Sequence, residues 1–151
     1  MFIPRELSEK LNKVSKQFPV VAVVGPRQSG KTTLVKNTFH AYRYVSLEDL
    51  DVRNFANNDP RGFLKTYNDK VIFDEAQRAP HLFSYIQGVV DQEKKLGQFI
   101  LTGSQNFLVH EGISQSLAGR VALLMLVPLS LKELAKEGLL LYDYPYYLYQ
   151  G

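Results

Sequence analysis

The sequence contains no cysteine, no long apolar run and no strong excess of one charge. Without cysteine the chain can form neither a disulfide bond nor a thiolate metal site, which fits a reducing compartment. No apolar segment approaches the roughly 20 residues that a membrane-spanning helix needs. The first residues, MFIPRELSEKLNKVSK, carry charges where a signal peptide has its apolar core. We therefore expect a cytoplasmic protein with no membrane partner.

The charge balance is only mildly basic. The chain has 151 residues, with 18 Lys and Arg against 15 Asp and Glu, so its net charge is +3 and its pI is about 9.0. This excess gives only weak support for a nucleic-acid partner, which usually requires a pronounced basic patch. A hydrophobic content of 45% and a charged content of 22% are those of an ordinary globular protein, and the length fits one domain.

What the sequence does contain is a phosphate-binding motif. The apolar run Val20–Val24 predicts a buried strand, and GPRQSGKT at positions 25–32 fits G-x-x-x-x-G-K-[ST], the P-loop. The residues after this motif have helical character, so the loop joins a strand to the N-terminus of a helix, where anions bind. Gly25 and Gly30 permit backbone angles that a Cβ atom would forbid, so that successive N–H groups can face a phosphate.

The motif assigns roles to individual residues. Lys31 would reach the β- and γ-phosphates of ATP, and the Thr32 hydroxyl would bind Mg²⁺. The residues that we expect to bind the nucleotide are Gly25, Pro26, Arg27, Gln28, Ser29, Gly30, Lys31, Thr32 and Thr33. The alternative is a strand-to-helix turn that binds nothing, and it is disfavoured because four fixed positions rarely coincide by chance.

A second apolar run, Val71–Phe73, ends in the adjacent carboxylates of Asp74 and Glu75. A buried strand that ends in Asp downstream of a P-loop is the Walker B pattern, in which Asp74 would hold Mg²⁺ opposite Thr32. Glu75 would orient and polarise a water for in-line attack on the γ-phosphate. The alternative is that the two carboxylates only begin the next helix, which we expect over residues 80–94.

Polar residues also follow a third buried strand, predicted over residues 98–102. In P-loop ATPases that have a Walker B glutamate, a polar residue on the strand between the two Walker strands contacts the γ-phosphate or the attacking water. Ser104, Gln105 and Asn106 stand where such a sensor would lie, and we favour Ser104 or Gln105. The alternative is an N-terminal cap for a helix predicted over residues 107–117. The two roles are compatible with each other.

Arg120 stands immediately before a further apolar run that ends near Pro128. An arginine that reaches a neighbouring subunit's γ-phosphate can accelerate hydrolysis by about 10³–10⁵-fold. An arginine also pairs readily with nearby carboxylates or carbonyls, so two interpretations of Arg120 stay open.

Strand and helix patterns alternate along the chain, which predicts an α/β fold with a parallel sheet and helices on both of its faces. The nucleotide would lie at the carboxyl ends of the strands. Strands are expected near residues 19–24, 42–47, 71–74, 98–102 and 120–127. Further helices are expected over residues 6–17, after the P-loop, around 50–55, and from Asp59 and Pro60, which suit the N-cap and first helical positions.

The segment 139–151 is crowded with Tyr and Leu and carries one charge. So apolar a segment is unusual on the surface of a domain. We expect it to pack against a following domain or a partner chain. Residues 1–138 would then form the ATPase domain, and residues 139–151 would begin a C-terminal region.

Several longer segments together resemble the family of prokaryotic AAA+-type ATPases with an uncharacterised C-terminal domain. The segments are IPREL, VVGPRQSGKTTLVK, YVSLEDLDVRNFANNDPRGFL, VIFDEAQRAP, FILTGSQNFL and SLAGRVALLMLVPLS. The resemblance implies a RecA/AAA+-like P-loop NTPase fold, and it implies ATP and Mg²⁺ as ligands. It also implies that Asp74 and Glu75 serve metal and water, that 104–106 is the sensor position and that Arg120 is the finger candidate. The resemblance also implies a later helical region and a further domain that would follow these segments.

The sequence therefore predicts a Mg²⁺-dependent ATPase domain whose turnover drives a conformational change, with a homo-oligomer in which Arg120 acts in trans as one arrangement. The alternative is a nucleotide-dependent binding module that hydrolyses slowly or not at all. A small-molecule kinase is less favoured, because neither an arginine-rich lid nor an acceptor pocket is evident.

Overall fold

The computed structural model describes residues 5–26, 29–104, 106–107 and 111–126. Arg27, Gln28 and Gln105, which the sequence assigns to the site, lie outside the described residues. The boundary expected near residue 138 and the Tyr-rich segment after it also lie outside them.

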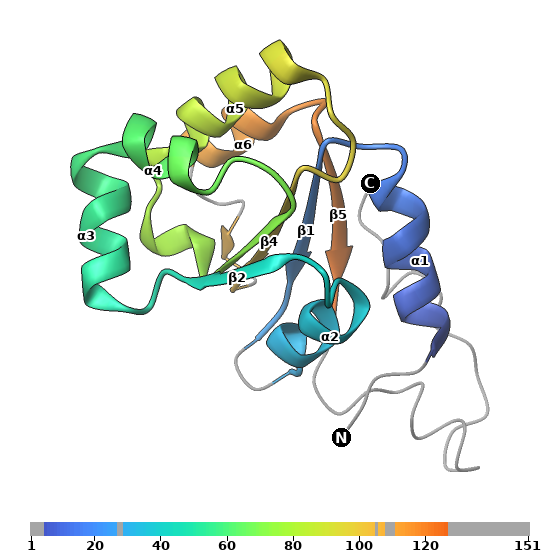
Figure 1. Cartoon of the computed structure of the whole chain (residues 1–151). Coiled ribbons are helices and arrows are strands. Elements are labelled where there is room, and N and C mark those ends of the chain that lie inside the picture. The colour runs from blue at the N-terminus through green and yellow to red at the C-terminus, as the bar shows by residue number, and fades with distance from the viewer. Residues whose placement is uncertain (1–4, 27–28, 105, 108–110, 127–151) are drawn as a thin grey trace.

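Strands and helices alternate along the described chain, as the sequence predicts (Figure 1). The strands are β1 (Val20–Val24), β2 (Arg43–Ser46), β3 (Val71–Asp74), β4 (Phe99–Gly103) and β5 (Val121–Met125). The helices are α1 (Arg5–Ser15), α2 (Lys31–Thr38), α3 (Leu50–Asn58), α4 (Pro60–Thr66), α5 (Leu82–Glu93) and α6 (Glu111–Leu117), with a 3₁₀ turn, η1, at Ala76–Arg78. Among the described helices, none is long and apolar enough to cross a membrane.

The five strands form one parallel sheet in the order β2-β3-β4-β1-β5. Strand β4 therefore lies between β1, which leads into the P-loop, and β3, which ends in Asp74. Parallel pairing aligns Val24 with Gly103, so the carboxyl ends of the strands lie together at one end of the sheet. The predicted parallel α/β architecture is confirmed.

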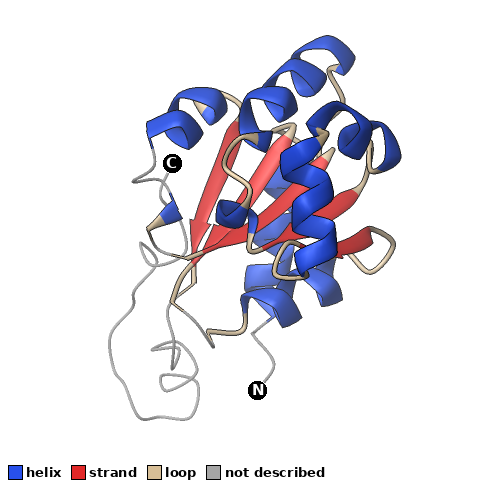
Figure 2. Ribbon diagram, turned by 90° about the vertical axis from the view of Figure 1, so that its left-hand side faces the viewer, coloured by secondary structure: helices blue, strands red, loops and turns tan. Residues whose placement is uncertain are grey.

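Helices cover both faces of the sheet, and each face has its own apolar core (Figure 2). Side chains alternate along β1: Val20, Ala22 and Val24 enter one core, while Val21 and Val23 enter the other. Helices α3 to α6 pack on the first face, and α1 and α2 pack on the second. Because β1 is buried on both sides, all five of its positions are apolar, which is typical of a central parallel strand.

Capping residues set the start of α4 as predicted. Asp59 accepts a hydrogen bond from the N–H of Gly62 at 3.0 Å, and Pro60 takes the first helical position, where no N–H is needed. The helix expected around residues 50–55 continues to Asn58, and Asp49 caps it.

The helix predicted over residues 107–117 is present as α6, described from Glu111 to Leu117, and residues 108–110 before it lie outside the described residues. The Phe107 N–H donates to the Ser104 carbonyl in a turn. The Phe107 ring is buried, and its centroid lies 5.5 Å from the centroid of the Phe83 ring.

Ile100 offers a test of the core on the α1/α2 side. It is fully buried on β4, between β1 and β3. Ile100→Ala is expected to lower the free energy of unfolding by about 2–5 kcal/mol, through lost transfer energy and the cavity left behind. Denaturant unfolding with circular dichroism measures this change. The control is Leu50→Ala, at a side chain 62% exposed, which should change stability by less than about 0.5 kcal/mol.

Candidate functional site

The P-loop follows β1 with two glycines that are required for different reasons. Gly30 has φ 91°, a left-handed conformation that favours glycine, and it leads directly into α2 at Lys31. Gly25 does not have a positive φ, so the expectation that it needs glycine for its backbone angles is wrong. A methyl group at Gly25 would instead overlap the carbonyl oxygen of Leu126, which follows β5. Close approach of two chain segments explains this glycine.

Lys31 is 5% exposed and turns back into the loop. Its Nζ atom donates to the carbonyl oxygens of Gly25 at 2.9 Å and Pro26 at 2.8 Å. A buried ammonium group requires such acceptors, because taking a charge out of water is costly unless it is paired or hydrogen-bonded. The loop backbone thus holds a positive charge beside the first turn of α2.

Asp74, at the carboxyl end of β3, is 6% exposed and meets hydroxyl groups from three different elements. Thr32 Oγ1 lies 3.1 and 3.2 Å from its two carboxylate oxygens, and the Tyr44 hydroxyl lies 2.5 Å from Oδ2. Thr102 Oγ1 donates to Oδ1. Because an ionised carboxylate only accepts hydrogen bonds, hydroxyl donors on every side suit a buried Asp.

Neither Thr102 nor Tyr44 belongs to a motif that marks it in the sequence, and no role was expected for either. Thr102 is fully buried near the end of an otherwise apolar strand, a position where a polar side chain is itself a signal. Burial, then the hydrogen bond to Asp74 and the charge of that carboxylate, raises the pKa of the Tyr44 hydroxyl far above its ordinary value. The hydroxyl therefore remains protonated and remains a donor.

Glu75 follows Asp74 with φ 56°, which is uncommon for a residue other than glycine. Its N–H donates to Thr102 Oγ1 at 2.9 Å, and its Oε1 atom accepts from Gln77 Nε2 at 2.8 Å. Its side chain makes no capping bond to η1, and α5 starts only at Leu82. These contacts do not support the alternative that Glu75 serves to begin a helix. Strained backbone held by specific contacts is frequent at functional sites.

A cavity of about 310 Å³ lies where these groups meet. Its lining residues are Ser29, Gly30, Lys31, Thr32, Thr33, Glu48 and Glu75. The Ser29 hydroxyl is buried and has no hydrogen-bond partner among the described residues. One ammonium group, an unpaired buried hydroxyl and the hard oxygen atoms of Thr32 and Asp74 are the chemistry that a phosphate and Mg²⁺ require. The residues present therefore fit a magnesium-bound nucleotide.

The sensor candidates are less closely tied to this cavity. Ser104 directly follows β4 and is half-buried, but it is not among the residues that line the cavity. Asn106 is exposed, and Gln105 lies outside the described residues.

Arg120 lies at the end of the sheet where the strands begin, whereas the P-loop lies at the end where they finish. The Arg120 carbonyl accepts a hydrogen bond from the N–H of Val20, at the amino end of β1. The length of β1 separates the two ends of the sheet by about 13 Å. The guanidinium group makes two hydrogen bonds to Asp91 of α5, Nε–Oδ1 at 2.7 Å and Nη2–Oδ2 at 2.8 Å. This pairing lowers the pKa of the Asp91 carboxyl. Arg120 therefore does not contribute to the cavity of its own chain.

Comparison with known proteins places this geometry in a family. A family model described as an AAA domain matches residues 17–135. Two uncharacterised proteins, Mb2031c of Mycobacterium bovis and Rv2008c of Mycobacterium tuberculosis, are each 32% identical over 137 residues. The match covers 89% of this chain and 31% of each relative, so the chain spans about a third of the length of these relatives.

Solved structures share the fold at low sequence identity. The Walker-type ATPase of Pyrococcus abyssi matches with a TM-score of 0.60 and 16% identity, over 94% of this chain and 60% of its own. AMPPCP-bound DnaA of Aquifex aeolicus matches with a TM-score of 0.57 and 18% identity, over 95% and 56%.

Two glycines provide a matched test of the loop geometry. Gly25→Ala is expected to lower the free energy of unfolding by about 1–3 kcal/mol, because its methyl group must displace the Leu126 carbonyl. Gly88→Ala, in the interior of α5 with open space around it, should instead raise stability by about 0.5–1 kcal/mol. Urea unfolding of both variants measures the two signs. Equal effects at both positions would contradict the close approach described for Gly25.

Proposed function

The chain belongs to the AAA domain family, and on that premise we propose that it binds ATP with Mg²⁺ and hydrolyses the β–γ bond to drive a conformational change. The observation that carries this proposal is the convergence of Lys31, Thr32, Asp74 and Glu75, two of them buried charges, at one edge of the sheet. Such an arrangement serves positioning and charge stabilisation, which supply most of the catalysis of phosphoryl transfer.

Nucleotide binding would use residues that line the cavity. The Lys31 ammonium group would exchange its two loop carbonyls for phosphate oxygens, and the Ser29 hydroxyl would gain the partner that it lacks. The N-terminus of α2 adds backbone N–H donors and a partial positive charge.

Thr32 and Asp74 would hold the metal. When bound, Mg²⁺ neutralises charge that develops on the β- and γ-phosphate oxygens. Thr32 Oγ1 already lies against the Asp74 carboxylate, so the two oxygen ligands are placed together by α2 and β3 before any ligand binds.

Glu75 would orient the attacking water and accept its proton, a contribution of about 10²–10⁴-fold. Gln77 restrains one carboxylate oxygen of Glu75, and Thr102 holds its backbone N–H, so both the side chain and the main chain of Glu75 are restrained. Ser104, Gln105 or Asn106 would report the γ-phosphate to the rest of the domain.

Arg120 would act on the nucleotide of a neighbouring subunit. Arg120 lies at the amino end of the strands, too far from the cavity of its own chain, and this position supports a contact with the cavity of a second copy. To reach a neighbour's γ-phosphate, its guanidinium group would have to leave Asp91.

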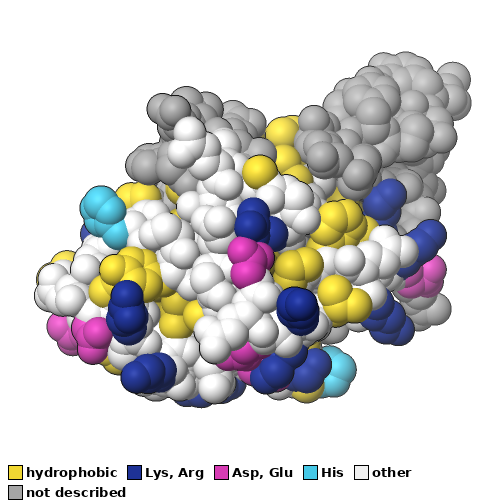
Figure 3. All heavy atoms as spheres, turned by 90° about the horizontal axis from the view of Figure 1, so that it is seen from above, with side chains coloured by type: hydrophobic (Ala, Val, Ile, Leu, Met, Phe, Trp, Pro, Cys, Tyr) yellow, Lys and Arg dark blue, Asp and Glu magenta, His cyan; other side chains and the backbone are white. Residues whose placement is uncertain are grey.

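The relatives are about three times longer than this chain, which supports a further domain as a partner of the ATPase domain. We propose that residues 1–138 form the ATPase domain of a cytoplasmic protein and that residues 139–151 begin its C-terminal region. A nucleic-acid partner has little support, because Lys and Arg side chains are interspersed with Asp and Glu on the face seen in Figure 3.

One observation favours the second candidate, a nucleotide-dependent binding module with little hydrolysis. No arginine lines the cavity among the described residues, and Arg120 is paired with Asp91. A single copy of the domain would then bind ATP firmly and turn it over slowly. Nucleotide affinity and turnover measured on the same sample distinguish the two candidates.

Glu75→Gln tests hydrolysis in the full-length protein that carries this chain. It keeps the size of the side chain but removes the base, so ATP binding should be retained while turnover falls about 10²–10⁴-fold. Glu9→Gln, an exposed change on α1, is the control and should leave both quantities unchanged. Undiminished turnover in Glu75→Gln would remove Glu75 from the mechanism.

Mixing two inactive variants tests whether Arg120 acts in trans. Arg120→Ala should bind ATP but lose turnover by about 10³-fold or more, with Arg61→Ala of α4 as the exposed control. A mixture of Arg120→Ala with Glu75→Gln should regain activity, because an intact cavity can then face an intact arginine. If the mixture is no more active than its components, Arg120 does not serve a neighbour.

A further inference from the structure

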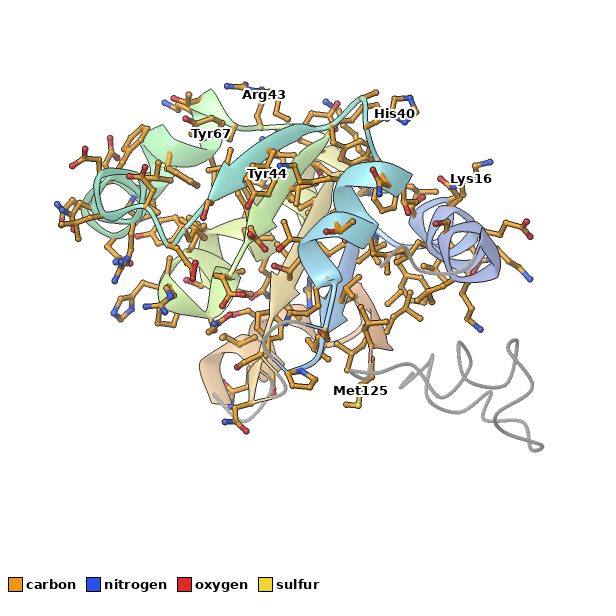
Figure 4. The ribbon with its side chains drawn as sticks, turned by 90° about the horizontal axis from the view of Figure 1, so that it is seen from below. Lys16, His40, Arg43, Tyr44, Tyr67 and Met125 are labelled. Atoms are coloured by element: carbon orange, nitrogen blue, oxygen red, sulfur yellow. The ribbon has the colours of Figure 1, made fainter. Side chains whose placement is uncertain are left out.

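The Tyr44 hydroxyl contacts Asp74 from the edge strand β2. Tyr44 is directly opposite Ile72 in the register, and Asp74 is opposite Ser46, so Tyr44 and Asp74 are diagonal neighbours. In this parallel pair, two residues along the strand and one strand across separate the Cα atoms by about 8 Å, which only a long side chain can cross. In Figure 4, Tyr44 points from β2 toward the middle of the molecule, whereas the adjacent Arg43 lies at its outer edge.

The Tyr44 ring is held in place by a second element. The ammonium group of Lys36, in the last turn of α2, lies 4.2 Å from the ring centroid, a cation–π contact. The hydroxyl reaches Oδ2 of Asp74 at 2.5 Å. The ring is thus fixed between α2 and β3, although Tyr44 is 38% exposed.

The three hydroxyl groups around Asp74 differ in what happens when a metal arrives. Thr32 Oγ1 would bind the metal through an oxygen lone pair and keep its O–H for Asp74, so its position would depend on the metal as well as on the carboxylate. Thr102 stays on Oδ1 and Tyr44 stays on Oδ2, one donor for each carboxylate oxygen. Without the Tyr44 hydroxyl, the described donor that still contacts Oδ2 is Thr32, which would itself bind the metal, so Tyr44 is the donor that restrains this oxygen independently of the metal.

We propose that Tyr44 is a positioning residue for the magnesium site: its hydroxyl orients the Asp74 carboxylate toward Mg²⁺. The inference rests on the proposed function and adds a residue on a strand that carries none of the nucleotide-binding motifs. Removal of a group that hydrogen-bonds to a metal ligand and orients it typically lowers the metal affinity by about 10–100-fold.

A competing effect has the opposite sign. The Tyr44 hydroxyl occupies a lone pair of Oδ2 that a cation or its bound water could use, so its removal could strengthen binding. Orientation is expected to dominate, because a carboxylate has about four lone-pair sites and Tyr44 uses one of them.

Tyr44→Phe removes the hydroxyl and leaves the ring beneath Lys36. Binding of N-methylanthraniloyl-ATP, followed by fluorescence, is titrated with Mg²⁺ and repeated in EDTA. We expect the half-saturating Mg²⁺ concentration to rise about tenfold, while the affinity in EDTA stays within about twofold of the wild type. The matched control is Tyr42→Phe, which removes a hydroxyl that donates to the Gly97 carbonyl at 2.6 Å, away from the cavity. It should leave the Mg²⁺ dependence unchanged.

The outcomes separate this inference from the function on which it rests. An unchanged or lower Mg²⁺ requirement in Tyr44→Phe overturns the positioning role. Equal losses with and without Mg²⁺, or a melting temperature well below that of Tyr42→Phe, show a structural role and also overturn it. If the wild type binds no N-methylanthraniloyl-ATP, the proposed function fails, and this inference fails with it.

Discussion

Lys31 and Asp74 are two buried charges of opposite sign at the carboxyl end of the strands. The rest of the site depends on giving both of them hydrogen-bond partners. A charge removed from water must be hydrogen-bonded or paired. The P-loop backbone supplies acceptors for Lys31, and hydroxyl groups from α2, β2 and β4 supply donors for Asp74. These partners come from four separate parts of the chain, so the site forms only when the sheet has its native strand order.

The strand order turns sequence-distant residues into neighbours. Because β4 lies between β1 and β3, Thr102 can bond both the Asp74 side chain and the Glu75 backbone. Because β2 lies on the other side of β3, Tyr44 can approach the same carboxylate from the edge. The two apolar cores keep these strands aligned, and a side chain lost from either core would therefore weaken the site at a distance.

Much of this arrangement could be predicted from local patterns. Apolar runs bounded by glycine, proline and charged residues located all five strands to within one or two residues, and the Asp59–Pro60 pair located the start of α4. The remainder depends on contacts between distant residues. Neither the space needed at Gly25 nor the packing of the Phe107 ring against Phe83 is visible in a local pattern. The pairing of Arg120 with Asp91 likewise requires knowledge of where α5 lies. Thr102 was the exception, since a polar residue in an apolar strand could have been noticed.

A crystal structure of the chain grown with Mg²⁺ and AMPPCP tests the central claim most directly. The account predicts that Lys31 Nζ leaves the carbonyls of Gly25 and Pro26 for phosphate oxygens, and that Thr32 Oγ1 coordinates Mg²⁺ beside Asp74. The cavity lined by Ser29 and Glu75 would then contain the γ-phosphate. A nucleotide bound elsewhere, with Lys31 still donating to both carbonyls, would contradict it.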